Sequence, residues 1–190
     1  MEGLQPVQLL SGPSGSGKST TARVWADTRT ETTAWIDCDA VRGFIRAGHA
    51  RPDVSFDDEA ERQWMLAARI SAQMARAYLQ ESIRCVIDVY APPTQELDVW
   101  DHQLAGLTVA RVHLFPTFDV CRLRNAQRTG IARLSDEALQ GNYSGYAWCI
   151  ERAPTAHVID NTSLSIDDTV AELERLITPH RQSPLRHTLG

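Results

Sequence analysis

One stretch of the sequence decides the fold: Gly12-Pro13-Ser14-Gly15-Ser16-Gly17-Lys18-Ser19-Thr20. It fits the pattern G-x-x-x-x-G-K-[S/T] at every fixed position. An apolar run over residues 7–10 precedes it, and a helix-compatible segment over 20–26 follows it. This pattern forms a phosphate-binding loop only between a strand and a helix, and both flanks are present. Its glycines let successive backbone N–H groups face phosphate oxygens, and the following helix adds the positive end of its dipole. The sequence therefore predicts a nucleotide-phosphate site.

The pattern also predicts a role for each residue of the loop. Lys18 is expected to reach the β- and γ-phosphates and to act in catalysis, and the Ser19 hydroxyl is expected to bind Mg²⁺. ATP and Mg²⁺ are therefore the expected cofactors. The residues predicted to bind the nucleotide are Gly12, Ser14, Gly15, Ser16, Gly17, Lys18, Ser19 and Thr20.

Composition narrows the class of protein. The 190 residues are enough for one domain, and we expect a single domain over 1–190. The net charge of −5 disfavours a large nucleic-acid surface. The four cysteines are widely spaced without a C-x-x-C pair, which argues against a zinc knuckle or a disulfide framework. No apolar run approaches the roughly 18 residues of a membrane span. We expect a cytoplasmic protein without membrane contact; its oligomeric state stays open.

Predicted strands alternate with predicted helices along the chain. The strands cover 7–11, 32–37, 84–88, 108–115 and 157–160, and the helices cover 18–27, 40–47, 57–80, 94–104, 118–128 and 165–177. This alternation predicts an α/β fold: a three-layer α/β/α P-loop NTPase with a five-stranded parallel sheet. The segment 129–146 holds three glycines and few apolar residues, so we expect a small mobile lid there with a short helix capped by Ser135.

Three aspartates follow predicted strands on the edge that carries the phosphate loop. Ligands of such sheets bind at the carboxyl ends of the strands. Asp88 is expected to hold Mg²⁺ or its waters. Asp39 is expected to bind the acceptor and to take the proton of its hydroxyl in line with the γ-phosphate; the alternative is that Asp39 only caps the next helix. Two roles for Asp37 are equally favoured: it binds the waters of the metal, or it makes a structural hydrogen bond.

Three arginines are further candidates. Arg42 lies on the same helix face as Asp39, where it either orients the acceptor or is an ordinary surface residue. Arg124 and Arg128 share a face of the helix before the lid. Arg124 is expected to flank the nucleotide, and Arg128 is expected to neutralise charge in catalysis as the lid closes. The alternative is an ordinary charged helix face.

Together these residues resemble the small P-loop kinases of the nucleoside-monophosphate-kinase-like fold, and most closely the group of chloramphenicol phosphotransferase and uncharacterised bacterial AAA-type ATPases. The resemblance rests on the loop, on 37–42, on 86–88, on 124–128 and on 160–162. The pair Asp39-x-x-Arg42 also looks like the acid–arginine pair of adenylylsulfate kinases, zeta-toxin-like sugar-nucleotide kinases and polynucleotide 5′-kinases. In those families the aspartate activates or positions the acceptor, and the resemblance implies the same role for Asp39.

The expected function is an ATP-dependent kinase that moves the γ-phosphate of ATP to a hydroxyl of a small-molecule acceptor. One alternative is a polynucleotide 5′-hydroxyl kinase, which predicts a basic groove and salt-dependent binding. Another is a switch protein that binds ATP without phosphorylating anything. An aspartate placed for a hydroxyl and an arginine-bearing lid favour the kinase.

Overall fold

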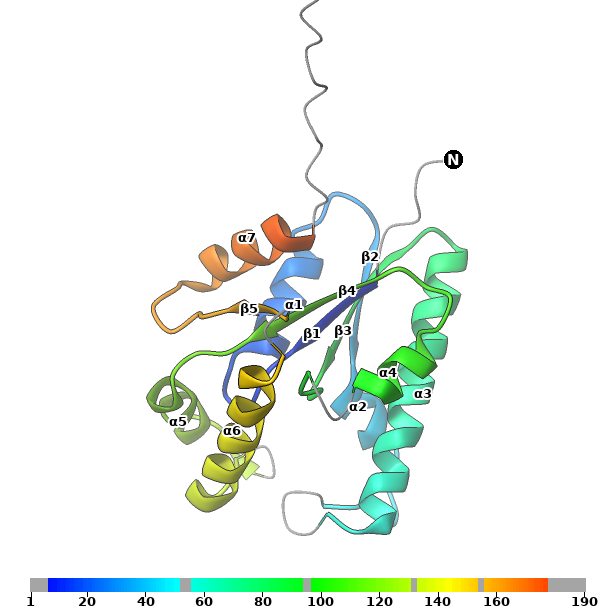
Figure 1. Ribbon diagram of the computed structural model, residues 1–190. Helices are drawn as coiled ribbons and strands as arrows, with labels where there is room; N and C mark the ends of the chain where they lie inside the picture. The colour runs from blue at the N-terminus through cyan, green and yellow to red at the C-terminus, as the bar shows by residue number, and fades with distance from the viewer. Residues whose placement is uncertain (1–6, 52–55, 94–96, 131–132, 154–155, 178–190) are drawn as a thin grey trace, which may run out of the picture.

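The computed structural model describes residues 7–51, 56–93, 97–130, 133–153 and 156–177 (Figure 1). Within these residues the strands form one five-stranded sheet in the order β2-β3-β1-β4-β5, and every neighbouring pair is parallel. The strands are β1 (Val7–Ser11), β2 (Thr33–Asp37), β3 (Arg84–Val89), β4 (Val109–Leu114) and β5 (His157–Ile159). The predicted five-stranded parallel sheet is confirmed.

Helices cover both faces of this sheet. They are α1 (Lys18–Asp27), α2 (Cys38–Gly43), α3 (Asp58–Gln80), α4 (Leu97–Gln103), α5 (Phe118–Ala126), α6 (Asp136–Glu151) and α7 (Ile166–Ile177). α1 and α7 pack on one face, and α3 with α2 and α4 packs on the other (Figure 1). The result is the predicted three-layer α/β/α arrangement.

The side chains on the two faces of the central strands contribute to two separate hydrophobic cores. On β1, Leu9 points into the core under α3, and its neighbour Leu10 points into the core under α1 and α7. Both side chains are almost fully buried, as are Val86 and Ile87 of β3. Successive side chains of a strand point to opposite faces, so continuous apolar runs are what a sheet covered on both sides requires. Burying each such side chain contributes about 1.5–3 kcal/mol.

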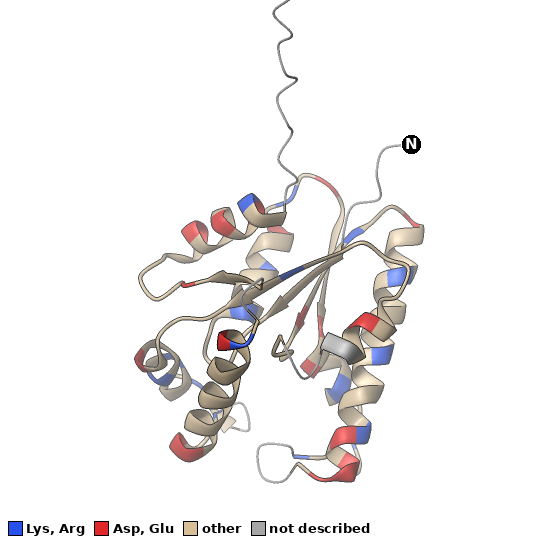
Figure 2. Cartoon of the chain, in the orientation of Figure 1, with Lys and Arg blue, Asp and Glu red and all other residues tan. Residues whose placement is uncertain are grey.

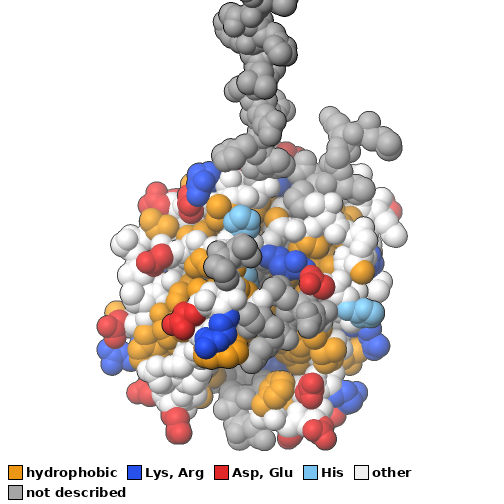
Figure 3. Space-filling model, viewed as in Figure 1, with side chains coloured by type: hydrophobic (Ala, Val, Ile, Leu, Met, Phe, Trp, Pro, Cys, Tyr) orange, Lys and Arg blue, Asp and Glu red, His pale blue; other side chains and the backbone are white. Residues whose placement is uncertain are grey.

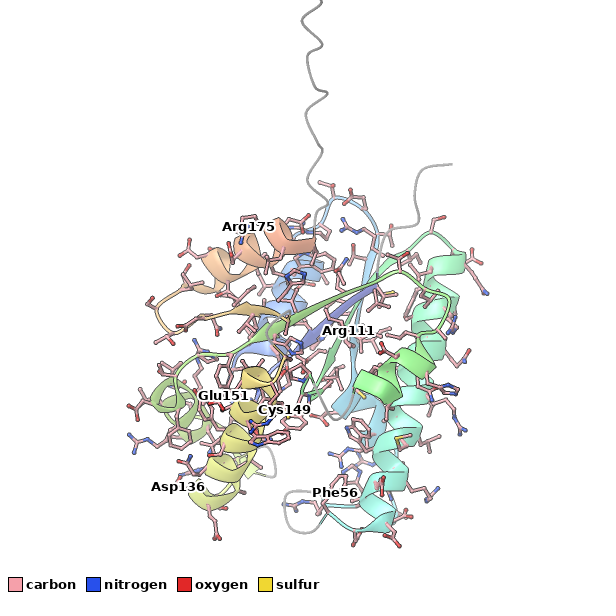
Figure 4. All side chains as sticks on the ribbon, in the orientation of Figure 1. Phe56, Arg111, Asp136, Cys149, Glu151 and Arg175 are labelled. Carbon is pink, nitrogen blue, oxygen red and sulfur yellow. The ribbon has the colours of Figure 1, made fainter. Side chains whose placement is uncertain are left out.

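Helix α6 differs from its prediction. We expected a short helix inside 129–146, but α6 has 16 residues and runs on to Glu151, with Asp136 and Glu151 near its two ends in Figure 4. Leu139, Tyr146 and Cys149 are buried along one side of it. Its two glycines face open space. The tertiary contacts of the buried side outweigh the low helix propensity of glycine, roughly 1 kcal/mol per residue.

Because all strands are parallel, their carboxyl ends share one edge of the sheet. α5 and α6 flank this edge on one side, and α2 with the start of α3 flanks it on the other (Figure 1). Acidic residues stand at the carboxyl ends of β2 and β3, at the same edge (Figure 2). Among the described helices, none is long and apolar enough to cross a membrane.

Candidate active site

The phosphate loop lies between β1 and α1, as its sequence predicts. Gly15 has φ of +82°, and a Cβ atom there would lie 2.5 Å from the carbonyl oxygen of Cys121 on α5. Gly17 has φ of +95° and caps α1 in the left-handed conformation. Other residues adopt this conformation at a cost, and only glycine allows the close approach to α5. The two glycines therefore fix both the curl of the loop and its contact with α5.

The start of α1 presents backbone donors that no side chain uses. Its cap residue, Gly17, has no side-chain hydrogen bond to the helix. No acidic residue stands in the first turn. Lys18 and Ser19 open the helix and are both half-buried. Free N–H groups at a helix N-terminus, within a curled loop and beside a lysine, form a site suited to phosphate.

Asp88 lies next to this loop in the centre of the sheet. It pairs with Leu10 of β1 and with Asp37 of β2, and it is 2% exposed. The Ser19 hydroxyl donates a hydrogen bond to it, while within the described residues its Oδ1 atom has no partner. Burial raises the pKa of Asp88 to about 6, although nearby Lys18 and the Ser19 hydrogen bond oppose this rise.

A buried carboxylate with an unpartnered oxygen beside a hydroxyl fits a hard cation. Mg²⁺ in kinases is commonly held by one or two protein oxygens together with substrate phosphates. No group of three or more His, Cys, Asp or Glu side chains that could hold a metal occurs among the described residues. Asp88 and Ser19 therefore suit an ion that arrives with nucleotide, and a self-contained protein metal site is not needed.

The two aspartates at the carboxyl end of β2, Asp37 and Asp39, have different environments. Asp37 caps α2: its Oδ1 accepts hydrogen bonds from the N–H groups of Asp39 at 2.9 Å and Ala40 at 3.0 Å. The predicted helix over 40–47 therefore begins at Cys38 and ends at Gly43. The Asp39 side chain is 77% exposed. Capping is thus done by Asp37, and the carboxylate of Asp39 remains open to the edge of the sheet.

Arg42 is closely tied to its surroundings. Its side chain is 14% exposed, and Nη2 lies 3.6 Å from Oδ1 of Asp39. Nη1 donates to the carbonyl oxygen of Ala50 at 3.3 Å. A buried guanidinium anchored in this way is not an ordinary surface residue. It holds positive charge beside Asp39.

Arg124 and Arg128 reach the phosphate loop from α5 and the residues after it. Nη1 of Arg124 donates to the carbonyl oxygen of Ser16 at 2.9 Å, and Nη1 of Arg128 donates to Oγ of Ser14 at 2.9 Å. Asn161, after β5, also donates to the Ser16 carbonyl at 2.9 Å. The predicted charged pair thus supports the loop from outside.

A pocket of about 440 Å³ opens beside these contacts. Gly15, Gly17 and Thr20 line one side of it, and Arg124 and Asn161 line another. Its place beside the start of α1 suits the base and ribose of a nucleotide whose phosphates lie on the loop. A more open groove of about 470 Å³ runs between α1 and α7, but none of the predicted site residues lines it.

Three contacts at this edge of the sheet were not predicted from sequence. Asn142 of α6 accepts a hydrogen bond from the Ser14 amide at 2.8 Å. Tyr146 of α6 donates to Oγ of Ser11 at 2.9 Å and lies 2.7 Å from Nδ1 of His113. The sequence signal for these contacts is that polar residues stand within the apolar side of α6. It can be recognised only when the full length of the helix is known.

Comparisons with known proteins show the family and the fold of the chain. A family model described as AAA domain matches residues 7–142. No curated protein shows significant similarity to the chain.

Several solved structures share the whole fold. A sugar kinase from Janibacter sp. HTCC2649 is 21% identical with a TM-score of 0.64, covering 91% of this chain and 94% of that one. A gluconokinase from Sinorhizobium meliloti 1021 is 19% identical with a TM-score of 0.63, covering 92% of each chain. A shikimate kinase from Acinetobacter baumannii, in complex with shikimate, is 16% identical with a TM-score of 0.63, covering 94% and 96%. The chain therefore has the fold of small P-loop kinases, as predicted.

Proposed function

This chain belongs to the AAA domain family, and we propose that it is an ATP-dependent kinase that moves the γ-phosphate of ATP to a hydroxyl of a small-molecule acceptor. The observation that carries the proposal is the pairing of a phosphate loop with the exposed carboxylate of Asp39 on the same sheet edge. Asp37 does the capping, so Asp39 is not required for the fold of α2. The similar structures include a sugar kinase, a gluconokinase and a shikimate kinase, which supports the same class of acceptor.

Each residue has a defined role in this proposal. The loop amides and Lys18 hold the phosphates, and the pocket beside Arg124 takes the base. Asp88 and Ser19 hold Mg²⁺, which supplies positive charge against the phosphates when bound. Asp39 accepts the proton of the acceptor hydroxyl, and Arg42, whose Nη2 lies 3.6 Å from its Oδ1, orients that carboxylate. Arg128 neutralises charge that develops on the transferred group.

A polynucleotide acceptor fits the surface less well. The chain carries a net charge of −5. On the face seen in Figure 3, the Lys and Arg side chains of the described residues are scattered among acidic and apolar ones. A nucleic-acid kinase requires clustered positive charge along the path of the phosphate backbone. We therefore propose a small acceptor.

The test is a screen for a phosphorylated product. The protein is incubated with ATP and Mg²⁺ and, in separate reactions, with sugars, sugar acids, nucleosides, antibiotics and oligonucleotides carrying 5′-hydroxyls. We expect one small-molecule class to accelerate ADP release and to gain a phosphoryl group by mass spectrometry. The Lys18→Ala variant is the control and should lose nearly all turnover without loss of fold, because Lys18 supports no part of the core.

The sequence offers a further control, because Lys18 is its only lysine. An amine-reactive reagent should modify Lys18 and the chain terminus alone, and ATP should protect Lys18. Salt-sensitive transfer to oligonucleotides would favour the nucleic-acid kinase instead. Slow hydrolysis that no acceptor accelerates would favour a nucleotide-binding switch.

A further inference from the structure

The loop residue Ser14 is held by contacts from outside the loop. Its amide N–H donates to Oδ1 of Asn142 on α6 at 2.8 Å, and its hydroxyl accepts from Arg128 at 2.9 Å. The amide of Ser14 is therefore bonded to another helix, whereas the amides of such loops ordinarily face phosphate. The contact joins residues 128 positions apart in the chain, so it depends on the docking of α6.

Helix α6 is fastened to the same edge at two further points. Tyr143 donates to the carbonyl oxygen of Pro116 at 3.0 Å, and Tyr146 donates to Oγ of Ser11, which ends β1. Tyr146 is fully buried. Asn142 thus lies on a firmly packed part of α6, and its amide group has a fixed position beside the loop.

The other end of this amide group is free. Within the described residues, Nδ2 of Asn142 has no hydrogen-bond partner, and the side chain is half-buried. Nδ2 and Oδ1 are bonded to the same carbon, so Nδ2 lies close to the position that Oδ1 occupies beside Ser14. It is a donor with two N–H groups at the rim of a phosphate site.

Ser14 lies at the end of the loop that is farther from the base pocket. Gly15, Gly17, Thr20 and Thr21 line that pocket, and Ser14 is not part of its lining. A nucleotide with its base there extends its phosphates along the loop, with the terminal phosphate farthest from the base. The terminal phosphate therefore comes nearest to Ser14 and to the amide that holds it.

We propose that Asn142 is a positioning residue for the terminal phosphate of ATP: Oδ1 holds the Ser14 amide while Nδ2 donates to a γ-phosphate oxygen. The proposal rests on the proposed function only in that the loop binds ATP. It gives α6 a part in distinguishing ATP from ADP, because only ATP carries the phosphate that Nδ2 reaches.

The test is Asn142→Asp. A carboxylate keeps an acceptor for the Ser14 amide, but it replaces the free donor by a negative charge. We expect ATP affinity to fall about tenfold more than ADP affinity, because like charges a few ångströms apart repel and the β-phosphate lies one phosphate farther away. Gln140→Glu is the matched control: it adds the same charge to an exposed position of the same helix. It should change both affinities less than about twofold.

Calorimetry with ATP and with ADP, in the presence of Mg²⁺, gives the two affinities for each variant. Thermal unfolding without nucleotide checks that each variant folds. An unchanged ratio of ATP to ADP affinity in a folded Asn142→Asp variant would overturn the proposal, since a purely structural asparagine predicts that result. The measurement needs no acceptor. A parent chain that binds ATP but phosphorylates nothing would refute the kinase proposal and leave this one standing.

Discussion

At the scale of single residues, the two aspartates on either side of Cys38 have different roles: Asp39 is proposed to act in catalysis, and Asp37 stabilises α2. Asp37 accepts two backbone hydrogen bonds at the start of α2, whereas the Asp39 side chain is exposed beside Arg42. We predict that Asp39→Asn lowers acceptor-dependent transfer by about 10²–10⁴-fold, because asparagine cannot take a proton. ATP affinity should stay near that of the parent.

The matched variant is Asp37→Ala, which should lower the free energy of unfolding by about 1 kcal/mol through loss of the cap. Urea unfolding and calorimetry with ATP are measured on both variants, and turnover is measured once an acceptor is known. Full turnover in Asp39→Asn would refute the assignment of the base. Asp37 and Asp88 would then be the remaining candidates for the base.

Asp88 presents the opposite case, a residue that destabilises the ligand-free protein. Burial raises its pKa to about 6, so its charge at neutral pH is unfavourable in the fold. We predict that Asp88→Asn raises the free energy of unfolding at pH 8 by about 1–3 kcal/mol without nucleotide. It should also weaken the Mg²⁺-dependent part of ATP binding, since the buried oxygen is proposed to face the ion.

Urea unfolding at pH 8 checks the first effect, and ATP titration with and without Mg²⁺ checks the second. Ser71→Ala is a useful control, because Ser71 is also a buried polar residue but lies on α3, in no predicted site. A loss of stability in Asp88→Asn would show that its charge is structural. The assignment of the metal ligand would then fail.

The sequence predicted residues whose role depends on a local pattern, and it missed those whose role depends on packing. Lys18, Ser19 and Asp88 follow from the loop pattern and from the end of an apolar strand. Asn142 acquires its contact only when α6 docks against a loop 128 residues earlier in the chain. No local spacing encodes that distance, so the contact could not be predicted.

At the scale of elements, the mobile lid stays a prediction, and the structure narrows where it can move. Leu139 and Tyr146 are fully buried on α6. Asn125 binds both the amide and the carbonyl of Leu134, at 3.1 and 2.9 Å. We predict that amides of 139–151 are protected from hydrogen exchange without ligand. Amides between Arg128 and Ser135 should gain protection with a non-hydrolysable ATP analogue.

Hydrogen exchange followed by mass spectrometry compares the two segments, ideally with acceptor present. The last turns of α7, residues 172–177, provide an internal control and should not respond, since the residues of this helix that line the base pocket, Ile166 and Thr169, lie in its first turn. Equal protection of 128–135 with and without nucleotide would remove the lid from the proposed mechanism. Rapid exchange throughout α6 would instead restore the larger lid expected from sequence.

Element types were predictable because hydrophobic periodicity reports which faces are buried. The short apolar runs predicted all five strands. The spacing of apolar residues over 57–80 predicted α3 with its first residue wrong by one position. The length of α6 was not predictable, because Gly141 and Gly145 lower helix propensity. Only its contacts with the sheet edge show why the helix persists.

At the scale of the whole molecule, a buried chain of hydrogen bonds joins β1, β4, α6 and the residue Ala91 after β3. The Ser11 hydroxyl donates to the Ala91 carbonyl and accepts from its amide. Ser11 therefore accepts from Tyr146, whose only hydroxyl proton is used there. The Tyr146 oxygen must then accept from Nδ1–H of His113, at 2.7 Å. This order places a proton on Nδ1 of His113, and because burial lowers the pKa of the ring, the imidazole is the neutral Nδ1–H tautomer.

The buried imidazole makes the stability of the molecule depend on pH. Burial, together with the smaller effects of the Arg111 and His157 charges, lowers the pKa of His113 to about 4 (Arg111 is labelled in Figure 4). The unfolded chain takes up this proton near pH 6.5, whereas the folded chain takes it up only near pH 4. The contribution of His113 to the free energy of unfolding is therefore fully present above pH 6.5, and it is lost as the pH falls toward 4. The contribution of His113 to this loss should be about 2 kcal/mol between pH 7 and pH 5.

The variant His113→Asn isolates this contribution, because its side-chain amide can still donate to Tyr146 but does not titrate. We predict that the free energy of unfolding falls less steeply from pH 7 to pH 5 in His113→Asn than in the parent, whatever the variant loses at pH 7. Both chains retain Asp88, whose raised pKa acts in the opposite direction over part of this range, so its effect cancels in the comparison. Tyr146→Phe removes the hydrogen bond but keeps the imidazole, and it should retain a steep decline. Urea unfolding at the two pH values gives both slopes; equal slopes in parent and His113→Asn would show that His113 is charged or exposed in the folded protein.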